Sequence, residues 1–354
     1  MQNNLPPNES ASKKPGKKKI IIWGVCLGVI FLSLFCWLFF SPLFFKKSTS
    51  SAIIKIPVSA TKEQVRDSIS KYLGEDFANQ VIRVASLRSS DFSGRHGAYM
   101  IEEGMSPYKT ERKLSVGSQY PLTLTINGFR SKQRLADKVA AKLDFAPDSL
   151  ENLLNDATFL EGYSLTPEQS LALFIDDSYQ VYWSASPMDV VNKIGKNYNR
   201  IWNDDRKKRA MELGFSPAEI MIICSIVDEE SNKADDKGKI GRLYMNRVKK
   251  GMKLQADPTV KFALGDFSLR RIRNNHLQVE SPYNTYKVTG LPPGPIRTTS
   301  FATIDSVLYS QPHNYLYMCA KDDFSGYHAF AINYSDHLQN ARKYQQALNR
   351  RGIK

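Results

Sequence analysis

An uncharged, strongly apolar stretch near the N-terminus constrains this chain more than any other feature. Residues 20–45 read IIIWGVCLGVIFLSLFCWLFFSPLFF and contain no charged side chain in 26 positions. As a helix that rises ~1.5 Å per residue, Ile20 to Phe40 alone would extend roughly 32 Å, which is enough to cross a bilayer. A cleaved signal peptide is the competing interpretation, because small residues follow at 48–52, but its apolar region runs only ~7 to 15 residues. We therefore predict an uncleaved transmembrane helix at residues 20–45.

The net charge of +14 supports this prediction because it is unevenly distributed. The first 47 residues hold seven lysines against one acid, and five of the lysines lie in the tail 1–19 before the span. The positive-inside rule places that basic tail in the cytoplasm and everything from the tether 46–52 onward outside. The rest of the chain has no basic stretch with interleaved aromatic residues, so we do not expect a nucleic-acid partner. The sequence predicts a single-pass protein of the cell (inner) membrane with a periplasmic or extracytoplasmic body.

Cysteine and histidine usage indicates a body that needs neither a disulfide framework nor a metal. Two of the four cysteines lie inside the predicted span, which leaves Cys224 in an apolar helix and Cys319 in a strand-like stretch. One disulfide between them would fit an exported body, but we expect two buried free thiols. No Cys or His pair has the spacing of a zinc site, and no cofactor motif occurs. We expect no metal and no cofactor.

The exported body divides into two regions of mixed secondary structure. Residues 53–117 read as strand, two helices, strand and helix, with a capping box at 61–64 and a Ser106-Pro107 helix start. Residues 118–354 begin with the alternating strand 121–126, include a second strand predicted at 179–183 and continue as a larger mixture of helices and strands. The expected fold class is α+β, with a small α+β module followed by a larger mixed α+β domain.

The most informative segment is an apolar helix that ends in three acids. A helix start is predicted at residues 216–219, where an N-cap serine is followed by a proline and, two residues later, a glutamate. Residues 220–227 (IMIICSIV) are apolar nearly all round, so this helix is expected to be buried. The acids 228–230 then oppose the helix macrodipole, at a cost of ~0.3 to 1 kcal/mol each. Glu230 follows the apolar face, where burial and like charge raise the pKa of a carboxyl group and suit it to general-acid catalysis. The alternative is a solvated acidic helix end paired with Lys233 or Lys237.

A series of separated motifs follows in the sequence. The first is Ser225 to Ser231, which includes Asp228, Glu229 and Glu230, and the others are Asn246-Arg247, residues 251–260 (GMKLQADPTV), 283–286 (YNTY) and 290–296 (GLPPGPI). In this order they resemble the endolytic murein transglycosylases of the MltG (YceG-like) family. The resemblance extends weakly to the anchor and to residues 97–99, which are similar to the family's LysM-like module. Where this chain has Asp228-Glu229-Glu230, the family often has Glu-Lys-Glu, so a cation beside the acid is missing.

The resemblance implies a membrane-anchored lytic transglycosylase that acts on peptidoglycan glycan strands. Such an enzyme cleaves the MurNAc-β-1,4-GlcNAc bond of nascent strands without water, forms 1,6-anhydro-MurNAc and terminates strand elongation. The family's catalytic glutamate falls on Glu230, which would act first as acid and then as base. The candidate protein partners are peptidoglycan synthases or division proteins. We expect the remaining site residues in two groups: substrate-binding Gln255, Tyr283, Asn284 and Tyr286, and supporting Asp228, Glu229, Asn246 and Asp257.

Three other interpretations compete with this one. A hydrolase would need a second carboxylate ~5 to 9.5 Å from the first, and Asp257 could serve, although Asp-Pro after a helix more often forms a turn or cap. Residues 68–71 (SISK) match the SxxK motif of penicillin-binding enzymes, but no SDN or KTG partner follows. A non-catalytic, membrane-anchored scaffold that binds peptidoglycan stays open as the alternative function.

Overall fold

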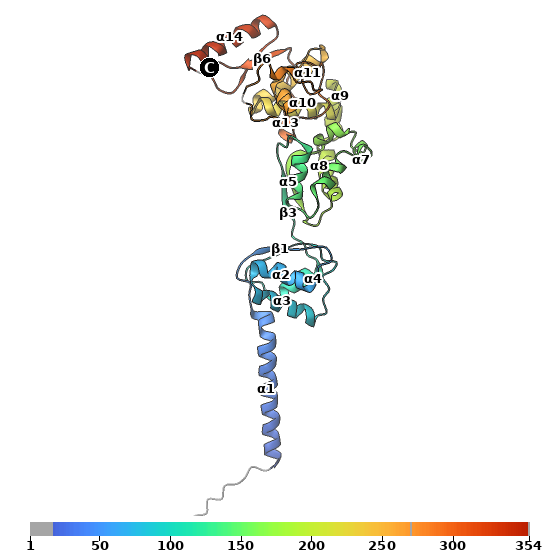
Figure 1. Ribbon diagram of the computed structural model, residues 1–354, viewed down its shortest axis with the longest axis vertical. Coiled ribbons are helices and arrows are strands. Elements are labelled where there is room, and N and C mark those ends of the chain that lie inside the picture. Colours follow the sequence, from blue (N-terminus) through green and yellow to red (C-terminus); the bar gives the residue numbers. More distant parts are fainter. Residues whose placement is uncertain (1–16, 270, 353–354) are drawn as a thin grey trace, which may run out of the picture. The chain divides into compact units, whose positions relative to one another are not determined.

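The computed structural model describes residues 17–269 and 271–352 and divides into two compact units. The N-terminal unit ends at Tyr120 and the C-terminal unit begins at Pro121. Both combine helices with small sheets, so the mixed α+β class is confirmed (Figure 1).

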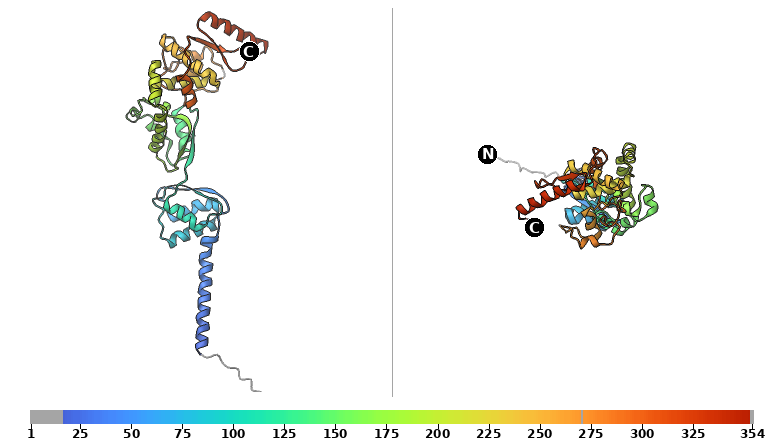
Figure 2. Two further views of the ribbon diagram at one scale, coloured as in Figure 1. Left: turned by 180° about the vertical axis from the view of Figure 1, so that it is seen from behind. Right: turned by 90° about the horizontal axis from the view of Figure 1, so that it is seen from above.

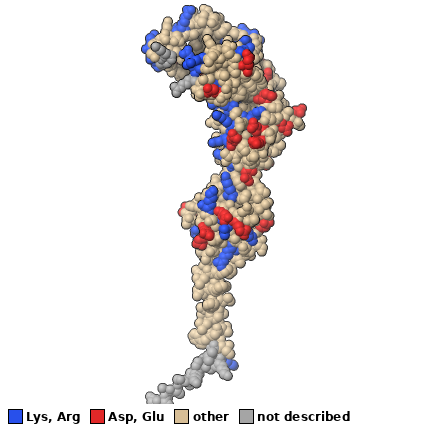
Figure 3. All heavy atoms as spheres, in the orientation of Figure 1, with Lys and Arg blue, Asp and Glu red and all other residues tan. Residues whose placement is uncertain are grey.

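The N-terminal unit begins with the long apolar helix α1 (Lys17–Phe45). Residues Ile21–Phe45 are long and apolar enough to cross a membrane, and no other single helix of the described chain passes the same test. Most of its large side chains are exposed, and its surface carries no charge over most of its length (Figure 3). This is the surface that a helix surrounded by lipid requires.

The last turns of α1 pack against the rest of the same unit. Leu43 is buried, the Phe44 ring lies 5.1 Å from the Tyr108 ring, and the Arg83 guanidinium lies 3.3 Å from the centre of the Phe39 ring. The C-terminal end of the predicted span is therefore covered by protein as well as being apolar.

The globular part of the N-terminal unit is a two-stranded antiparallel sheet packed with helices. In chain order the elements are β1 (Ala52–Ile56), α2 (Lys62–Leu73), α3 (Glu75–Leu87), β2 (Gly97–Ile101) and α4 (Pro107–Val116). The expected capping box is present: the Thr61 hydroxyl accepts a hydrogen bond from the Gln64 backbone, and the Gln64 side chain accepts one from the Thr61 backbone. Ser106 caps α4, and Gly117 ends it in the left-handed conformation.

The first part of the C-terminal unit surrounds a three-stranded sheet in the order β3-β4-β5. Strands β3 and β4 are antiparallel, whereas β4 and β5 are parallel, so a segment 124 residues further on, from Ile175 to its partner Thr299, completes the sheet. The elements are β3 (Leu122–Ile126), α5 (Lys132–Ala140), α6 (Pro147–Leu153), α7 (Ala157–Glu161), the 3-10 helix η1 (Pro167–Leu173), β4 (Ile175–Val181), α8 (Pro187–Ile201), α9 (Asp204–Leu213) and β5 (Thr299–Ser300). Strand β4 was expected at 179–183 and instead starts at Ile175, because its first residues pair with the distant β5.

The second part of the C-terminal unit is built around the buried helix α10 (Pro217–Glu230). It packs against α11 (Ala234–Lys249), α12 (Asp257–Leu264) and α13 (Phe301–Leu308). A β-carbon on Gly241 would lie 2.7 Å from Val307, so this glycine allows α11 and α13 to approach closely. A hairpin of β6 (Tyr317–Ala320) and β7 (His328–Ala331) follows, and the last helix α14 (Tyr334–Arg350) packs on it (Figure 2).

Cys224 and Cys319 do not form a disulfide in the structure. Cys224 is buried and Cys319 is half-buried, and both are free thiols.

Asp257-Pro258 is not an isolated turn: Asp257 begins α12, with Pro258 in the first turn. Proline has no N–H to lose at that position, which suits it to a helix start.

Candidate functional site

The candidate site lies at the C-terminal end of α10. A capping box of Ser216 and Glu219, with Pro217 at the first helical position, starts the helix as the sequence predicted. Residues 220–227 are all buried, so the helix is fixed in the core before it reaches its three acids. Each of these acids meets a different environment.

Asp228 is a structural anchor between α10, α11 and α13. Its Oδ1 accepts hydrogen bonds from Lys237 Nζ at 2.6 Å and from the Thr303 hydroxyl at 2.6 Å, and the Thr299 hydroxyl donates to Oδ2. The side chain is 6% exposed, so this ion pair is well shielded from water. The pairing with Lys237 that was considered for the acidic helix end therefore belongs to Asp228.

Glu229 is neutralised by two arginines from distant parts of the chain. Arg130 donates from Nε and Nη2 to its two carboxylate oxygens at 2.9 Å each, and Arg297 Nη1 donates to Oε1 at 3.0 Å. The Arg130 guanidinium also lies 5.0 Å from the centre of the Phe267 ring. Bidentate arginine–carboxylate contacts of this kind fix the carboxylate in position.

Glu230 has no such partner. No lysine or arginine forms an ion pair with it in the described residues, and its one hydrogen bond there comes from the Tyr244 hydroxyl, 2.9 Å from Oε1. Burial raises the pKa of Glu230 to about 7; the Tyr244 hydrogen bond opposes this shift and the negative charge of Asp257 adds to it. A substantial fraction of Glu230 is therefore protonated near neutral pH, as the sequence analysis expected.

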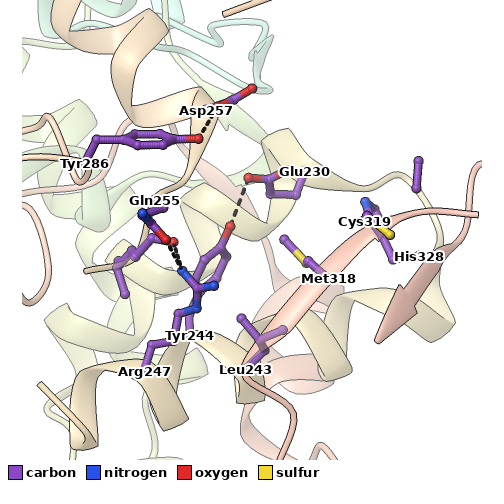
Figure 4. Close-up of a pocket in the computed structure, with 12 residues that line it drawn as sticks. Glu230, Leu243, Tyr244, Arg247, Gln255, Asp257, Tyr286, Met318, Cys319 and His328 are labelled. Carbon is purple, nitrogen blue, oxygen red and sulfur yellow. Dashed lines mark hydrogen bonds between the residues drawn. The ribbon is translucent and has the colours of Figure 1, made fainter. Parts of the chain in front are cut away.

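Glu230 opens into a cavity of about 260 Å³ (Figure 4). Asp257 and Tyr286 lie to one side of it, and the β6–β7 hairpin lies to the other. The lining residues are Glu230, Leu243, Tyr244, Arg247, Leu254, Gln255, Asp257, Tyr286, Met318, Cys319, Ala320 and His328.

Three of the expected site residues line this cavity with Glu230: Gln255, Asp257 and Tyr286. The Tyr286 hydroxyl donates to Asp257 Oδ1 at 2.6 Å, which fixes both groups in the wall. Asp257 was expected to play a supporting role, and the structure instead places its carboxylate in the cavity itself.

Gln255 has an unusual backbone conformation. Its φ of 51° lies in the left-handed region that side chains other than glycine rarely adopt. Its N–H donates to the Thr285 carbonyl at 3.1 Å, and its side-chain oxygen accepts from Arg247 Nη1 at 3.3 Å. Strained backbone of this type persists where surrounding contacts impose it, often at functional sites. Because the oxygen is engaged by Arg247, the amide nitrogen is the Gln255 group left to meet a ligand.

Three other expected residues lie outside the cavity lining. Asn284 is fully buried and donates to the carbonyls of Leu277 and Val279 at 2.9 and 2.8 Å, so it holds its own loop together. The Tyr283 ring packs on Phe262 with centroids 4.6 Å apart.

Asn246 is the third of these residues. Its amide donates to the carbonyls of His313 and Tyr315 at 2.7 and 3.2 Å, which ties α11 to the segment that leads into β6. These contacts give Asn246, like Asn284, a structural function in the described structure.

Sequence reasoning missed two parts of the wall. Tyr244 and Arg247 lie on α11. Arg247 belongs to the Asn246-Arg247 motif, so the sequence did contain a reason to expect it at the site. The hairpin residues Met318, Ala320 and His328 carried none, because they approach Glu230 only through the fold. Asp236 orients His328, accepting from its backbone N–H at 2.8 Å and lying 3.1 Å from its Nδ1.

The cavity shows no arrangement suited to a metal. Among residues 17–269 and 271–352, no group of three or more His, Cys, Asp or Glu side chains is placed to hold a metal ion. The chemistry available from the side chains is proton transfer by Glu230, with hydrogen bonding from the polar groups around it.

Comparison with known proteins identifies the family. The model of the YceG-like family matches residues 47–343, which is most of the chain. This protein belongs to the YceG-like family. The identification made from the sequence motifs is therefore confirmed.

Two curated relatives and one solved structure are similar to this YceG-like chain. It is 27% identical over 281 residues to the endolytic murein transglycosylase of Bacillus subtilis (strain 168), covering 72% of this chain and 74% of that protein. It is 32% identical over 130 residues to the endolytic murein transglycosylase of Streptococcus pneumoniae serotype 2 (strain D39), covering 36% of this chain and 23% of that protein. A crystal structure of a yceG-like protein from Listeria monocytogenes superposes with a TM-score of 0.55 at 22% identity, over 82% of this chain and 99% of that one. This last likeness shows the fold.

Proposed function

We propose that this protein is a membrane-anchored endolytic lytic transglycosylase that cleaves the MurNAc-β-1,4-GlcNAc bond of peptidoglycan. The observation that carries the proposal is Glu230, a carboxyl group whose pKa is raised to about 7, which opens into a cavity and has no paired cation among the described residues. A carboxylic acid that is protonated near neutral pH can donate a proton to a leaving oxygen. The Bacillus subtilis relative, which is named an endolytic murein transglycosylase, supports the same chemistry.

The reaction uses Glu230 twice. As an acid, it protonates the glycosidic oxygen while the bond from that oxygen to C1 of MurNAc breaks. As a carboxylate, it then accepts the proton of the C6 hydroxyl while O6 bonds to C1 and closes the 1,6-anhydro ring. The proton that leaves Glu230 is replaced by one from the substrate, so the enzyme returns to its starting state and no water is consumed.

The surrounding groups position this acid and the sugar. Tyr244 donates to Oε1 and so leaves Oε2 for the substrate. Asp257, held by Tyr286, adds negative charge to a cavity in which positive charge develops on the sugar ring. Gln255 supplies an amide hydrogen-bond donor to the substrate.

The same proposal covers the membrane anchor and the small module at residues 53–117. Helix α1 is assigned as a single transmembrane span with a cytoplasmic N-terminus, so the globular part of the N-terminal unit and the whole C-terminal unit are assigned to the outside of the cell (inner) membrane, where nascent glycan strands are found. Residues 53–117 are assigned as a LysM-like module, supported by the compact strand–helix–helix–strand order from β1 to β2. Cleavage of strands near the membrane would terminate their elongation, with peptidoglycan synthases or division proteins as candidate partners.

Purified glycan strands test this proposal directly. The wild-type protein and Glu230→Gln are incubated with strands in heavy-oxygen water, and the products are analysed by mass spectrometry. Wild type is expected to release 1,6-anhydro-MurNAc ends without heavy oxygen, and the variant is expected to release almost none. Heavy oxygen in the products would show hydrolysis, for which Asp257 would be the candidate second carboxylate, and intact strands with the wild type would indicate a binding scaffold.

A further inference from the structure

Arg247 is a buried cation in the wall of the cavity that has no anionic partner. The residue is 7% exposed, and none of the ion pairs in the described part of the chain includes it. A charged group taken out of water is costly unless another charge or several hydrogen bonds compensate it. Burial lowers the pKa of Arg247, which expresses that cost, although a guanidinium keeps its proton in proteins.

The guanidinium is held rigidly by neutral oxygens. Nε donates to the Leu316 carbonyl at 2.6 Å, and Nη1 lies 3.1, 2.9 and 3.3 Å from the Lys253 carbonyl, the Leu254 carbonyl and the Gln255 side-chain oxygen. The Tyr317 ring lies under it, 5.4 Å from the guanidinium carbon to the ring centre. Within residues 17–269 and 271–352 the hydrogen bonds of Arg247 come from Nε and Nη1 alone and leave Nη2 without a partner, and Arg247 lines the cavity with Glu230 (Figure 4).

This arrangement is a preformed site for an oxygen anion. A guanidinium has five N–H donors, and here Nε and Nη1 are used by the protein while Nη2 donates to no described residue. An anionic oxygen at Nη2 would complete the hydrogen bonding and balance the charge in one contact. Bonds of this charged type are roughly twice as strong as neutral ones.

We propose that Arg247 Nη2 binds the lactyl group on C3 of the muramic residue and thereby distinguishes MurNAc from GlcNAc in the cavity. This inference rests on the proposed function, which places C1 of that residue at Glu230. C3 belongs to the same sugar ring, and Arg247 lines the same cavity as Glu230, so we place the C3 substituent at this wall. The lactyl ether is also the group that distinguishes the two sugars of the strand.

The lactyl group presents oxygen in two chemical forms. In a strand without stem peptides it ends in a carboxylate, and in a peptide-bearing strand the same carbon is an amide carbonyl. Both forms accept a hydrogen bond from Nη2, but only the carboxylate compensates the buried charge. Arg247 should therefore bind the carboxylate form more tightly, and the preference should weaken as salt is added.

Equilibrium binding to the full chain carrying Glu230→Gln, in detergent, tests this inference without cleavage of the ligand. The ligands are an alternating GlcNAc-MurNAc tetrasaccharide, the same tetrasaccharide with its lactyl groups as amides, and a tetrasaccharide of GlcNAc alone. The carboxylate form is expected to bind on the order of 10- to 100-fold more tightly than the GlcNAc form, with the amide in between. Equal affinities at low salt would overturn the inference, whatever the variants below do.

Two matched variants identify the residue responsible. Arg247→Gln should remove most of the preference between muramic and glucosamine ligands. Arg242→Gln should not, because Arg242 is also a buried arginine of α11, 8% exposed, but it binds Ser310 outside the cavity. Thermal unfolding of both variants shows whether each has folded, and a preference that survives in folded Arg247→Gln contradicts the assignment.

The outcome is separable from that of the proposed function. A wild-type protein that binds the muramic ligand preferentially but forms no anhydro ends would refute the chemistry and keep the Arg247 site. A wild-type protein that forms anhydro ends while the three ligands bind equally would keep the chemistry and refute the Arg247 site.

Discussion

Each unit of this protein contains a glutamate held within the fold, and the two residues have opposite environments. In the N-terminal unit, Glu111 on α4 is fully buried, forms an ion pair with Arg88 Nε at 3.0 Å and accepts a hydrogen bond from the Ser90 hydroxyl. In the C-terminal unit, Glu230 opens into a cavity and receives one hydrogen bond from the neutral Tyr244. A cation beside a carboxyl group favours its charged form, whereas burial without a cation favours the protonated form.

The comparison shows that burial alone does not make an acid catalyst. Glu111 and Glu230 are the same residue type on helices, but Glu111 is paired with Arg88, whereas Glu230 has no paired cation among the described residues and lines a cavity. The neighbours of Glu230 support the same conclusion, because Asp228 and Glu229 each have a cation and neither lines the cavity. The absence of a paired cation is therefore what distinguishes the proposed catalytic acid.

The largest expected effect is on activity. Glu230→Gln should reduce the rate of glycan cleavage by about 10²- to 10⁴-fold, which is the usual contribution of a general acid. Glu111→Gln, the same change in the other unit, should leave the rate per folded molecule within about twofold. Cleavage assays with both variants check this. Similar losses of rate in the two would show that the different environments of Glu111 and Glu230 do not determine which glutamate is catalytic.

The second effect is on stability in the N-terminal unit. Glu111→Gln should destabilise the protein by about 1–3 kcal/mol, because it removes the ion pair inside the fold. The loss is limited because the Arg88 side chain is 43% exposed and can be hydrated instead. Thermal unfolding at pH 7 measures it, and an unchanged transition would show that the ion pair contributes nothing to the fold.

The third effect is on the pH dependence of stability in the C-terminal unit. The pKa of Glu230 is raised to about 7 in the folded protein from an ordinary value of 4.5, so the stability this group contributes is present below about pH 4.5 and is lost as the pH rises through 7. Glutamine never ionises, so Glu230→Gln should be more stable than wild type by about 2 kcal/mol at pH 8 and equal to it near pH 4.5. The value at pH 8 is smaller than the full pKa difference implies, because solvent in the open cavity screens the charge of Glu230. Unfolding curves across this pH range test the sign, and a variant that is less stable at pH 8 would contradict the raised pKa.

The smallest effect comes from the neighbours that tune Glu230. Tyr244→Phe removes a hydrogen bond that lowers the pKa of Glu230, so the alkaline limb of the pH–rate profile should move to higher pH. Asp257→Asn removes a negative charge that raises this pKa, so the same limb should move to lower pH. The rates at the optimum should fall only about threefold to tenfold in Tyr244→Phe, the value of one modest hydrogen bond. Shifts of the two limbs in the same direction would show that another group controls the profile.

Much of the local structure could be predicted because its determinants are neighbours in the chain. The capping boxes at Thr61 and Ser216 start helices where expected, and the apolar run 220–227 is buried as its composition indicated. The boundary errors occur where partners are distant, as for β4, whose first residues pair with β5.

The candidate site was predictable in part. Glu230, Gln255 and Tyr286 were expected from their motifs and line the cavity. Tyr283 and Asn284 belong to the same motif, but Tyr283 packs on Phe262 of α12 and Asn284 holds its own loop together, because a motif fixes the neighbours of a residue and not the direction of its side chain. Their presence in the motif does not show whether these side chains contact the substrate or only stabilise the loop beside the cavity.

The sequence by itself determined the apolar helix near the N-terminus, the mixed α+β class, the family and the acid at the end of a buried helix. Those features depend on composition and on contacts within a few residues. Tertiary structure decided which of the three acids lacks a cation, because Lys237, Arg130 and Arg297 reach their partners across 9, 99 and 68 positions. It also brought Arg247 and the β6–β7 hairpin to the cavity around Glu230. Charge pairing over such separations depends on how the chain folds back on itself, and local sequence patterns do not record it.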